Sequence, residues 1–294
     1  MIILPFHKLA CPLDGAPLQY SVSAWRCDAG HNFDISGHGY TNLLPVQFKR
    51  SRDPGDSKPM VAARRRFLNS GFYQPIAEAA SAAVLADLPS GATASCLDAG
   101  CGEGYYLRHL AASDSTVKTL DVLGLDISKW AVLAAAKQDR RINWVVGSNA
   151  NLPAQSGTLD RILCMFGFPV YTEFSRALKP GGQLVQVDAG PDHLIELRKI
   201  IYPSVIPEHA TGTPNAGGFT HLATENIRYT LELDSAEQIA DLLAMTPYLY
   251  RAKAEGRARA KALTSLSLTV DVRLVRFVRN ATLLTRRIFP TRSS

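Results

Sequence analysis

The sequence of 294 residues contains no long apolar run. Its hydrophobic stretches stay well short of the roughly 20 residues that a helix needs to cross a bilayer. The segment from Met1 to Leu13 has no sustained apolar stretch either, because Pro5, His7 and Lys8 interrupt it, and we therefore expect no signal peptide. These absences predict a cytoplasmic protein with no membrane partner.

Cysteine is too scarce for a disulfide framework. The chain has five cysteines, an odd number in a long sequence with no export signal. Three of them, Cys96, Cys101 and Cys164, stand among apolar residues, and we expect them to be small buried side chains. Cys11 and Cys27 lie in turn-rich sequence, where another use for the thiols is open.

Hydrophobic residues make up 46% and charged residues 20% of the chain, which is ordinary for a globular protein. The net charge of +6 is unevenly spread. Residues 1–70 hold nine Lys/Arg and five Asp/Glu, and residues 251–294 hold eleven Lys/Arg and two Asp/Glu. Two basic ends around an acidic middle favour a polyanionic partner.

Apolar segments alternate with helical patterns from residue 94 onward. Nearly continuous apolar strands separated by helices indicate a parallel sheet covered on both faces. Two final strands after the parallel part are typical of the seven-stranded methyltransferase version of the doubly wound, Rossmann-like fold, and we expect an α/β protein with such a domain. The turn-rich N-terminus, with Cys and His at suggestive spacings, predicts a small module of zinc-ribbon type. The predicted division is 1–42 for the module, 43–72 for a basic linker and helix, and 73–294 for the large domain. The predicted strands are 94–99, 120–125, 142–146, 159–166, 183–188, 227–233 and 266–277, and the predicted helices are 61–71, 75–88, 105–112, 129–138, 172–178, 193–201 and 235–245.

The motif LDAGCGEGYY follows the first of these strands and opens a helix. Glycines in such a loop let the backbone approach a ligand closely at the carboxyl end of the strand. The spacing G-x-G-x-G differs from the dinucleotide pattern G-x-G-x-x-G and is typical of a site for the methionine end of S-adenosylmethionine. We expect cofactor contacts from Asp98, Gly100, Gly102, Glu103 and Gly104.

The ends of the next two strands supply further candidates. Asp126 ends the second strand, about twenty residues after the glycine loop, where an acidic residue can accept both ribose hydroxyls. The alternative is that Asp126 caps the following helix. Ser148 and Asn149 follow the third strand, where adenine is usually contacted, or they form a plain turn.

Two motifs that would indicate particular methyl acceptors are missing after the fourth strand. The sequence MFGFPV lacks an Asp/Asn-Pro-Pro-aromatic motif, which would hold an exocyclic amine, and it lacks a Pro-Cys nucleophile for carbon methylation. The methyl acceptor is therefore expected to be a ring nitrogen or an oxygen. Direct displacement at the sulfonium methyl would then depend mainly on alignment of the two reactants.

Cys and His residues near the N-terminus have metal-ligand spacings. Cys11-Pro-Leu-Asp14-Gly15 is similar to a zinc knuckle whose second Cys is changed to Asp, and Cys27 and His31 form a Cys-x3-His half-site. Three good ligands and one carboxylate could bind zinc tetrahedrally. The alternative is a module that keeps its fold by packing its aromatic residues, without a metal.

Four motifs together resemble the RlmA family of 23S rRNA guanine-N1 methyltransferases. They are Gly39–Ser57, Phe72–Pro75, Leu97–Tyr106 and Met245–Ala252, and the match covers nearly the whole chain. The resemblance implies a 23S rRNA hairpin as the partner, guanine N1 as the acceptor, and S-adenosylmethionine and zinc as the bound groups.

The family's cofactor contacts carry over to Tyr73, Gly102, Glu103 and His193. The alternative for Tyr73 is a core aromatic at a helix start, and the alternative for His193 is a helix residue facing solvent. The family's zinc ligands carry over to Cys11, Cys27 and His31, whereas Asp14 replaces a family Cys.

A polyanionic partner would need phosphate ligands and a place for the target base. Phe168 and Tyr171 are candidates for stacking on a base taken out of its helix, and Asp188 is a candidate for accepting its proton. A homodimer that forms the RNA cleft is a hypothesis, and the choice of guanine and a role in antibiotic resistance stay open. The candidate phosphate ligands are Lys49, Arg50, Arg52, Arg64, Arg65 and Arg66.

Two other functions compete with this hypothesis. A small-molecule methyltransferase of the same fold would have no need of the N-terminal module or the basic linker. A non-catalytic RNA-binding protein would have no reason to keep Asp98, the glycine loop and Asp126.

Overall fold

The computed structural model describes residues 1–49, 51–204, 216–246, 248 and 252–281. The candidate phosphate ligand Arg50, and residues 247 and 249–251 of the Met245–Ala252 motif, lie outside the described residues. Within the described part of the chain, no helix is long and apolar enough to cross a membrane.

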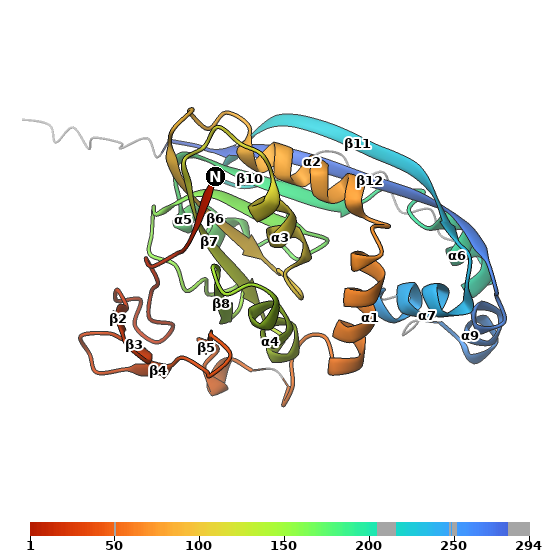
Figure 1. The fold of residues 1–294 in the computed structure, drawn as a ribbon, viewed down its shortest axis with the longest axis horizontal. Helices are drawn as coiled ribbons and strands as arrows, with labels where there is room; N and C mark the ends of the chain where they lie inside the picture. Colours follow the sequence, from red (N-terminus) through yellow and green to blue (C-terminus); the bar gives the residue numbers. More distant parts are fainter. Residues whose placement is uncertain (50, 205–215, 247, 249–251, 282–294) are drawn as a thin grey trace, which may run out of the picture.

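A twisted sheet forms the centre of the molecule (Figure 1). Its seven main strands follow the order β11-β12-β10-β9-β6-β7-β8. All neighbours in this row are parallel except β12, which is antiparallel to β10 and to β11. The predicted seven-stranded doubly wound fold is therefore confirmed. The strands are β6 (Thr93–Ala99), β7 (Thr119–Asp126), β8 (Asn143–Val146), β9 (Leu159–Met165), β10 (Leu178–Ala189), β11 (Phe219–Leu233) and β12 (Leu266–Arg279).

Two short strands from the first 42 residues enlarge this sheet to nine strands. β1 (Ile2–Pro5) pairs in parallel with the first half of β7, and β5 (Tyr40–Asn42) pairs in parallel with β8. Neither strand was predicted, because strands of three or four residues carry too little alternation to be recognised. The division at residue 42 stays a prediction, but both ends of the predicted module contribute strands to the main sheet.

Between β1 and β5 the chain forms a separate three-stranded antiparallel sheet. This sheet contains β2 (Gln19–Ser21), β3 (Ala24–Arg26) and β4 (Asn32–Asp34). It lies at one end of the molecule, beside the β5 and β8 edge, whereas α1, α7 and α9 lie toward the opposite end (Figure 1).

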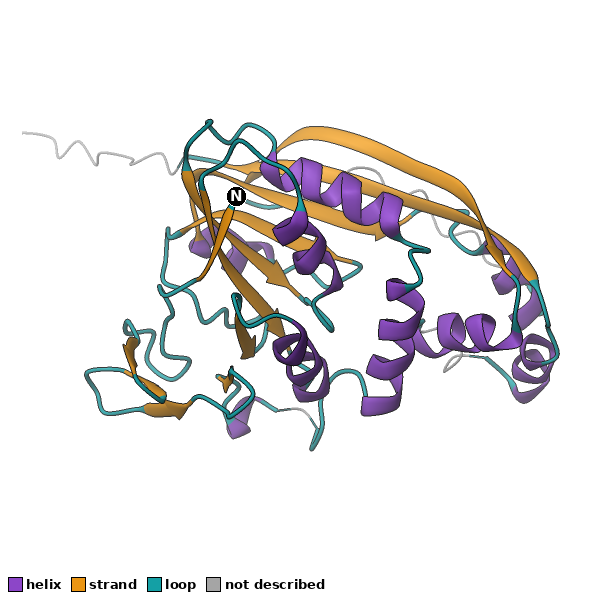
Figure 2. Ribbon diagram, viewed as in Figure 1, coloured by secondary structure: helices purple, strands orange, loops and turns teal. Residues whose placement is uncertain are grey.

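Helices and loops make up the rest of the described chain (Figure 2). Most bounds agree with the sequence patterns, but α9 was missed because its residues are basic and small, with no apolar face. The helices are η1 (Val46–Phe48), α1 (Lys58–Asn69), α2 (Gln74–Leu85), α3 (Tyr105–Ala112), α4 (Lys129–Gln138), α5 (Tyr171–Ala177), α6 (Ile195–Ile201), α7 (Ala236–Met245) and α9 (Ala254–Lys261).

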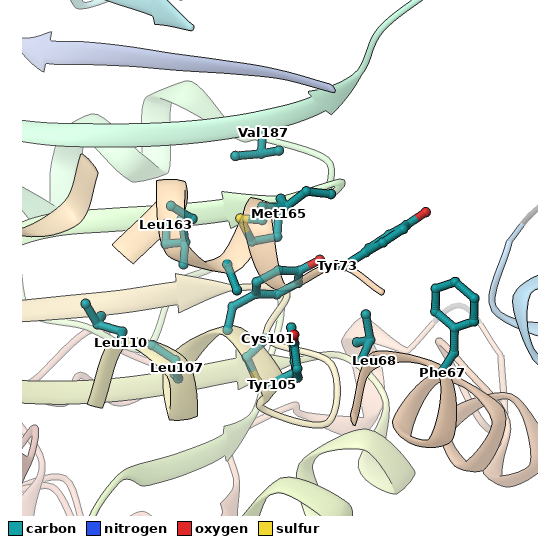
Figure 3. Packing of buried hydrophobic residues seen from close by; sticks show 14 of the residues in the cluster. Phe67, Leu68, Tyr73, Cys101, Tyr105, Leu107, Leu110, Leu163, Met165 and Val187 are labelled. Atoms are coloured by element: carbon teal, nitrogen blue, oxygen red, sulfur yellow. The ribbon is translucent and has the colours of Figure 1, made fainter. Parts of the chain in front are cut away.

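The core has two layers, because alternate residues of each buried strand point to opposite faces of the sheet. On β9, Leu163 and Met165 belong to the cluster that includes α2 and α3 (Figure 3). Ile162 and Cys164, on the other face, pack in the cluster that contains Phe174 of α5. Burial on both faces leaves the carboxyl ends of the strands as the place for a ligand.

Candidate active site and metal centre

A cleft of about 1550 Å³ runs along the carboxyl ends of the strands from β8 to β10. Eight of the ten predicted cofactor residues line it, although they come from five separate parts of the chain. Asp98 and Gly104 are not among the lining residues. The eight are Tyr73, Gly100, Gly102, Glu103, Asp126, Ser148, Asn149 and His193.

The glycine loop is held against the end of β7 by three hydrogen bonds. The amides of Gly100 and Cys101 both donate to the carbonyl of Leu125, over 2.8 and 2.9 Å. The amide of Gly102 donates to Oδ2 of Asp126 over 2.9 Å. Gly102 has a φ of 55°, in the left-handed region that glycine adopts most readily. The loop therefore depends on β7 for its shape.

Asp126 also organises the start of α4. Its Oδ1 accepts from the amide of Ser128 over 2.7 Å, and Ser128 in turn caps the helix by accepting from the amide of Ala131. The N-cap of α4 is therefore Ser128 and not Asp126, and the ribose contact of Asp126 stays a prediction. Each carboxylate oxygen accepts one hydrogen bond from the backbone and keeps a second lone pair for a ligand.

Asp98 and Gly104 lie behind the loop. Burial raises the pKa of the Asp98 carboxyl, and the nearby charge of Asp126 raises it further. Neither oxygen of Asp98 has a hydrogen-bond partner in the described residues. A cation bound at the loop would relieve this cost. A Cβ on Gly104 would lie 2.6 Å from the ring of Trp144, so this glycine is needed for packing.

Glu103 projects from the loop and is held in place by two side chains. Its Oε2 accepts from Nη1 of Arg108 over 3.1 Å and from Nε2 of Gln138 over 2.8 Å. Its other oxygen, Oε1, is buried and has no partner among the described residues. This oxygen is a ready acceptor for a donor in the cleft.

Tyr73 and His193 face each other on the opposite wall of the cleft. The Tyr73 hydroxyl lies 3.4 Å from Nε2 of His193. The amide of Asp271 donates to Nδ1 of His193 over 3.3 Å, which leaves the imidazole proton on Nε2. Burial lowers the pKa of His193 to about 4, so the ring is neutral at pH 7. His193 is buried and precedes α6, so it does not face solvent as the alternative interpretation held.

Asn149 ties three loops together. Its Nδ2 donates to the carbonyl of Ala99 over 3.3 Å and to the carbonyl of Phe168 over 3.2 Å. Its Oδ1 is buried with no partner in the described part of the chain, and it can accept from a ligand. Ser148, by contrast, uses its hydroxyl to accept from the amide of Ala150 within its own turn.

The predicted phosphate ligands of α1 differ in their surroundings. Arg64 lines the cleft, where it forms an ion pair with Asp56 at 2.5 Å and donates to the carbonyl of Met245. Arg66 donates to both carboxylate oxygens of Asp241, over 2.9 and 2.5 Å. Arg65 and Arg66 are both exposed, but of the three only Arg65 makes no side-chain ion pair or hydrogen bond with the described residues. Arg64 and Arg66 therefore hold elements of the protein together, a role that the run of three arginines did not predict.

The two predicted candidates for stacking on a base differ in exposure and in position relative to the cleft. Phe168 lines the cleft and is 90% exposed, which is unusual for an aromatic side chain. Tyr171 is half-buried, outside the lining residues, and its hydroxyl donates to Oε1 of Gln186 over 3.0 Å. Phe48 lines the cleft and is 52% exposed. Sequence reasoning missed Phe48, because the short helix η1 that it ends has no periodic pattern.

Four predicted metal ligands converge at the N-terminal module. The donor atoms of Cys11, Asp14, Cys27 and His31 all lie within 4.8 Å of one another. Nδ1 of His31 is 3.4 Å from the sulfur of Cys11, 3.3 Å from that of Cys27 and 3.1 Å from Oδ2 of Asp14. Tetrahedral zinc, with Zn–S about 2.3 Å and Zn–N about 2.0 Å, separates its ligands by roughly 3.3–3.8 Å. The donor set therefore fits zinc, with Asp14 as the fourth ligand.

The metal module also forms part of the cleft wall. Pro12, Leu13 and Gly15, which surround Asp14, are among the lining residues. Nδ2 of Asn151, in the loop after β8, donates to the carbonyl of Pro12 over 3.0 Å. The module is thus fixed beside the loop that carries Ser148 and Asn149.

Comparison with known proteins agrees with this geometry. Residues 9–52 match the family model described as RlmA, N-terminal, a zinc ribbon, and residues 96–182 match that of a methyltransferase domain. A Bacillus subtilis protein provisionally named 23S rRNA (guanine-N(1)-)-methyltransferase is 34% identical over 91% of this chain and 95% of its own length. The 23S rRNA (guanine(748)-N(1))-methyltransferase of Streptomyces fradiae is 34% identical over 81% of this chain and 84% of its own length. The chain therefore belongs to the RlmA-type family of 23S rRNA (guanine-N1)-methyltransferases.

Proposed function

We propose that this protein transfers a methyl group from S-adenosylmethionine to N1 of a guanine in a hairpin loop of 23S rRNA. The observation that carries the proposal is the single cleft that joins the glycine loop, Asp126 and the wall formed by the metal module. A small-molecule methyltransferase would not need that wall. Modification of rRNA would take place in the cytoplasm.

The chain's own residues suit this cofactor. The cofactor would supply a sulfonium methyl group that a nucleophile can displace. Asp126 would accept the ribose hydroxyls with its remaining lone pairs, Glu103 would receive the ammonium of the methionine end, and the charge of Asp98 would stabilise that ammonium from behind the loop. Neutral His193 would donate from Nε2, and Asn149 would accept with Oδ1. These roles account for the buried oxygens of Asp98, Glu103 and Asn149 that lack partners.

The RNA would be held by its phosphates and by its target base. Lys49, which lines the cleft, and the exposed Arg52 and Arg65 suit phosphate contacts. The target guanine would leave its stack and lie between the exposed rings of Phe48 and Phe168. Tight alignment of N1 with the methyl group would supply most of the rate enhancement.

We further infer that zinc occupies the four-ligand centre and holds the cleft wall in place. The fit of the ligand distances supports this inference. The predicted homodimer stays a prediction, and sedimentation of the protein at micromolar concentration tests it.

A methyl-transfer assay tests the proposed function. Purified protein is incubated with labelled cofactor and either hairpin transcripts of 23S rRNA or a metabolite extract. We expect label in the RNA alone, and mass spectrometry of the digested nucleosides should identify 1-methylguanosine. Label in the metabolite extract and none in any transcript would refute the RNA substrate. Asp126→Ala serves as the inactive control.

A further inference from the structure

Three side chains on one face of the sheet form a hydrogen-bonded chain that ends in the cleft. The hydroxyl of Tyr171 donates to Oε1 of Gln186 over 3.0 Å, and Nε2 of Gln186 donates to Oδ2 of Asp188 over 2.6 Å. A carboxylate can only accept, so the amide nitrogen of Gln186 must face Asp188, and its oxygen must face Tyr171. Gln186 is 3% exposed, so its amide is shielded from bulk water.

Asp188 stands where the methyl acceptor must enter. Most of the residues suited to the cofactor follow β6, β7 and β8, which lie beyond β9 from β10, whereas His193 follows β10 and faces Tyr73. Asp188 lies near the carboxyl end of β10 and lines the cleft, as do Phe166 and Phe168 at the end of β9. The space over β9 and β10 is therefore left for the target base.

The charged surroundings of Asp188 come from two neighbouring strands. Burial raises the pKa of its carboxyl, whereas the bond from Gln186 and the charge of Arg273 lower it. Arg273 is the residue directly opposite on β12. On β9, burial raises the pKa of the Cys164 thiol to about 12, so this side chain is uncharged. Asp188 is thus a carboxylate of increased basicity, held at a fixed orientation.

We propose that Asp188 accepts the N1 proton of the target guanine, and that Gln186 and Tyr171 are positioning residues that aim it. The proposal rests on the proposed function. The N1–H bond breaks and its proton passes to a carboxylate oxygen of Asp188. The electron pair left on N1 forms the new bond to the methyl carbon, and the pair of the broken carbon–sulfur bond stays on sulfur. Asp188 then releases its proton to water.

A carboxylate at this position would also explain why guanine is accepted and adenine is not. The Watson–Crick edge of guanine presents N1–H and the exocyclic amine side by side, and both are donors that a carboxylate can accept. Adenine presents a bare N1 at the same position, which a carboxylate repels. Asp188 would therefore select the base as well as deprotonate it.

Single-turnover methyl transfer to the hairpin, measured from pH 5 to pH 9, tests this proposal. Asp188→Asn should lower the rate by about 100-fold or more, as expected on loss of a general base, and should remove the acid limb of the profile. The calorimetric affinity for S-adenosylhomocysteine should stay within twofold of wild type. Asp121→Asn is the matched control, since burial also raises the pKa of Asp121 but it lies in the amino half of β7, away from the cleft.

Tyr171→Phe is the second variant, and it decides the matter should Asp188→Asn not fold. Loss of the hydroxyl weakens the hold of Gln186 on the carboxylate, so the pKa of Asp188 should rise. The acid limb should then move to higher pH, with a smaller loss of rate at pH 9. Wild-type rate and pH profile in Asp188→Asn, or an unmoved limb in Tyr171→Phe, would overturn the proposal. Failure of wild-type protein to form 1-methylguanosine would instead refute the proposed function.

Discussion

The carboxylate of Asp126 accepts a hydrogen bond from the backbone amide of Gly102 over 2.9 Å, across 24 positions of the chain. This bond joins the end of β7 to the loop after β6. The same residue that we propose as the ribose acceptor therefore also shapes the loop around the methionine end. We therefore expect binding of both halves of the cofactor to depend on this one side chain.

Replacement of Asp126 by Ala should weaken cofactor binding by roughly 10- to 100-fold. A hydrogen bond to a charged group contributes about 1.5–3 kcal/mol, and loss of the carboxylate also releases the amide of Gly102. Isothermal titration with S-adenosylhomocysteine measures the effect. Asp121→Ala, in the same strand, should bind as wild type does. An unchanged affinity in Asp126→Ala would remove this residue from the site.

The metal centre predicts opposite effects of two substitutions. His31→Ala removes a direct ligand and should weaken zinc binding by more than about 100-fold, since loss of an outer partner alone costs 10- to 100-fold. Asp14→Cys supplies a thiolate, the more usual ligand of structural zinc, and should retain the metal at higher chelator concentration than wild type. Elemental analysis of zinc after dialysis against a series of chelator concentrations measures both effects.

Asp28→Ala is the control for the metal centre, because Asp28 adjoins Cys27 but does not belong to the ligand cluster. It should hold zinc as wild type does. Equal zinc retention by His31→Ala and wild type would contradict the role of His31 as a ligand.

Arg65 and Arg66 should respond differently to replacement by Ala. Arg65 is exposed, so its loss should weaken RNA binding and reduce the salt slope of the affinity by about 1, with no change in stability. Loss of Arg66 leaves the buried carboxylate of Asp241 unpaired and should lower the free energy of unfolding by about 1–2 kcal/mol. Filter binding at several salt concentrations and urea unfolding measure the two effects. An unaltered salt slope in Arg65→Ala would exclude this side chain from the RNA interface.

His193 should make the protein acid-sensitive. Its pKa is lowered from about 6.5 in the unfolded chain to about 4 in the fold. His193 in the unfolded chain therefore binds a proton below pH 6.5, whereas His193 in the folded protein does not bind one until about pH 4. Stability is fully present above pH 6.5 and falls with pH, by about 2 kcal/mol at pH 5.

Urea unfolding at pH 7 and pH 5 measures this loss. His193→Gln should show a smaller difference between the two pH values than wild type, whereas His38→Gln, at an exposed position, should show the wild-type difference. A loss in His193→Gln as large as in wild type would mean that another group is responsible.

The sequence predicted the elements that carry strong periodicity. The helices at Tyr105–Ala112 and Lys129–Gln138 have the predicted bounds, because each lies between an apolar strand and a polar turn. The spacing between the glycine loop and Asp126 was sufficient to predict that these distant residues lie at one cleft. Backbone geometry fixes such a site, and glycine and strand-end patterns report backbone geometry directly.

Other features depend on contacts between residues far apart in the chain. The pairing of Arg66 with Asp241 joins α1 to α7, and no local pattern distinguishes it from the exposed Arg65. The position of Gly104 against Trp144 likewise follows from packing of the loop on β8. The hydrogen bonds that link Tyr171 to Asp188 through Gln186 could not be predicted without knowing how α5 lies against β10. Side-chain partners of this kind are set by tertiary structure.

The most direct measurement is a map of 23S rRNA methylation in a strain that lacks this protein, by reverse-transcription stops and mass spectrometry. We predict loss of one guanine-N1 methyl group in a hairpin loop, and its return when wild-type protein, but not Asp126→Ala, is supplied. An unchanged map would contradict the proposed function and would leave a methyltransferase fold with a different acceptor.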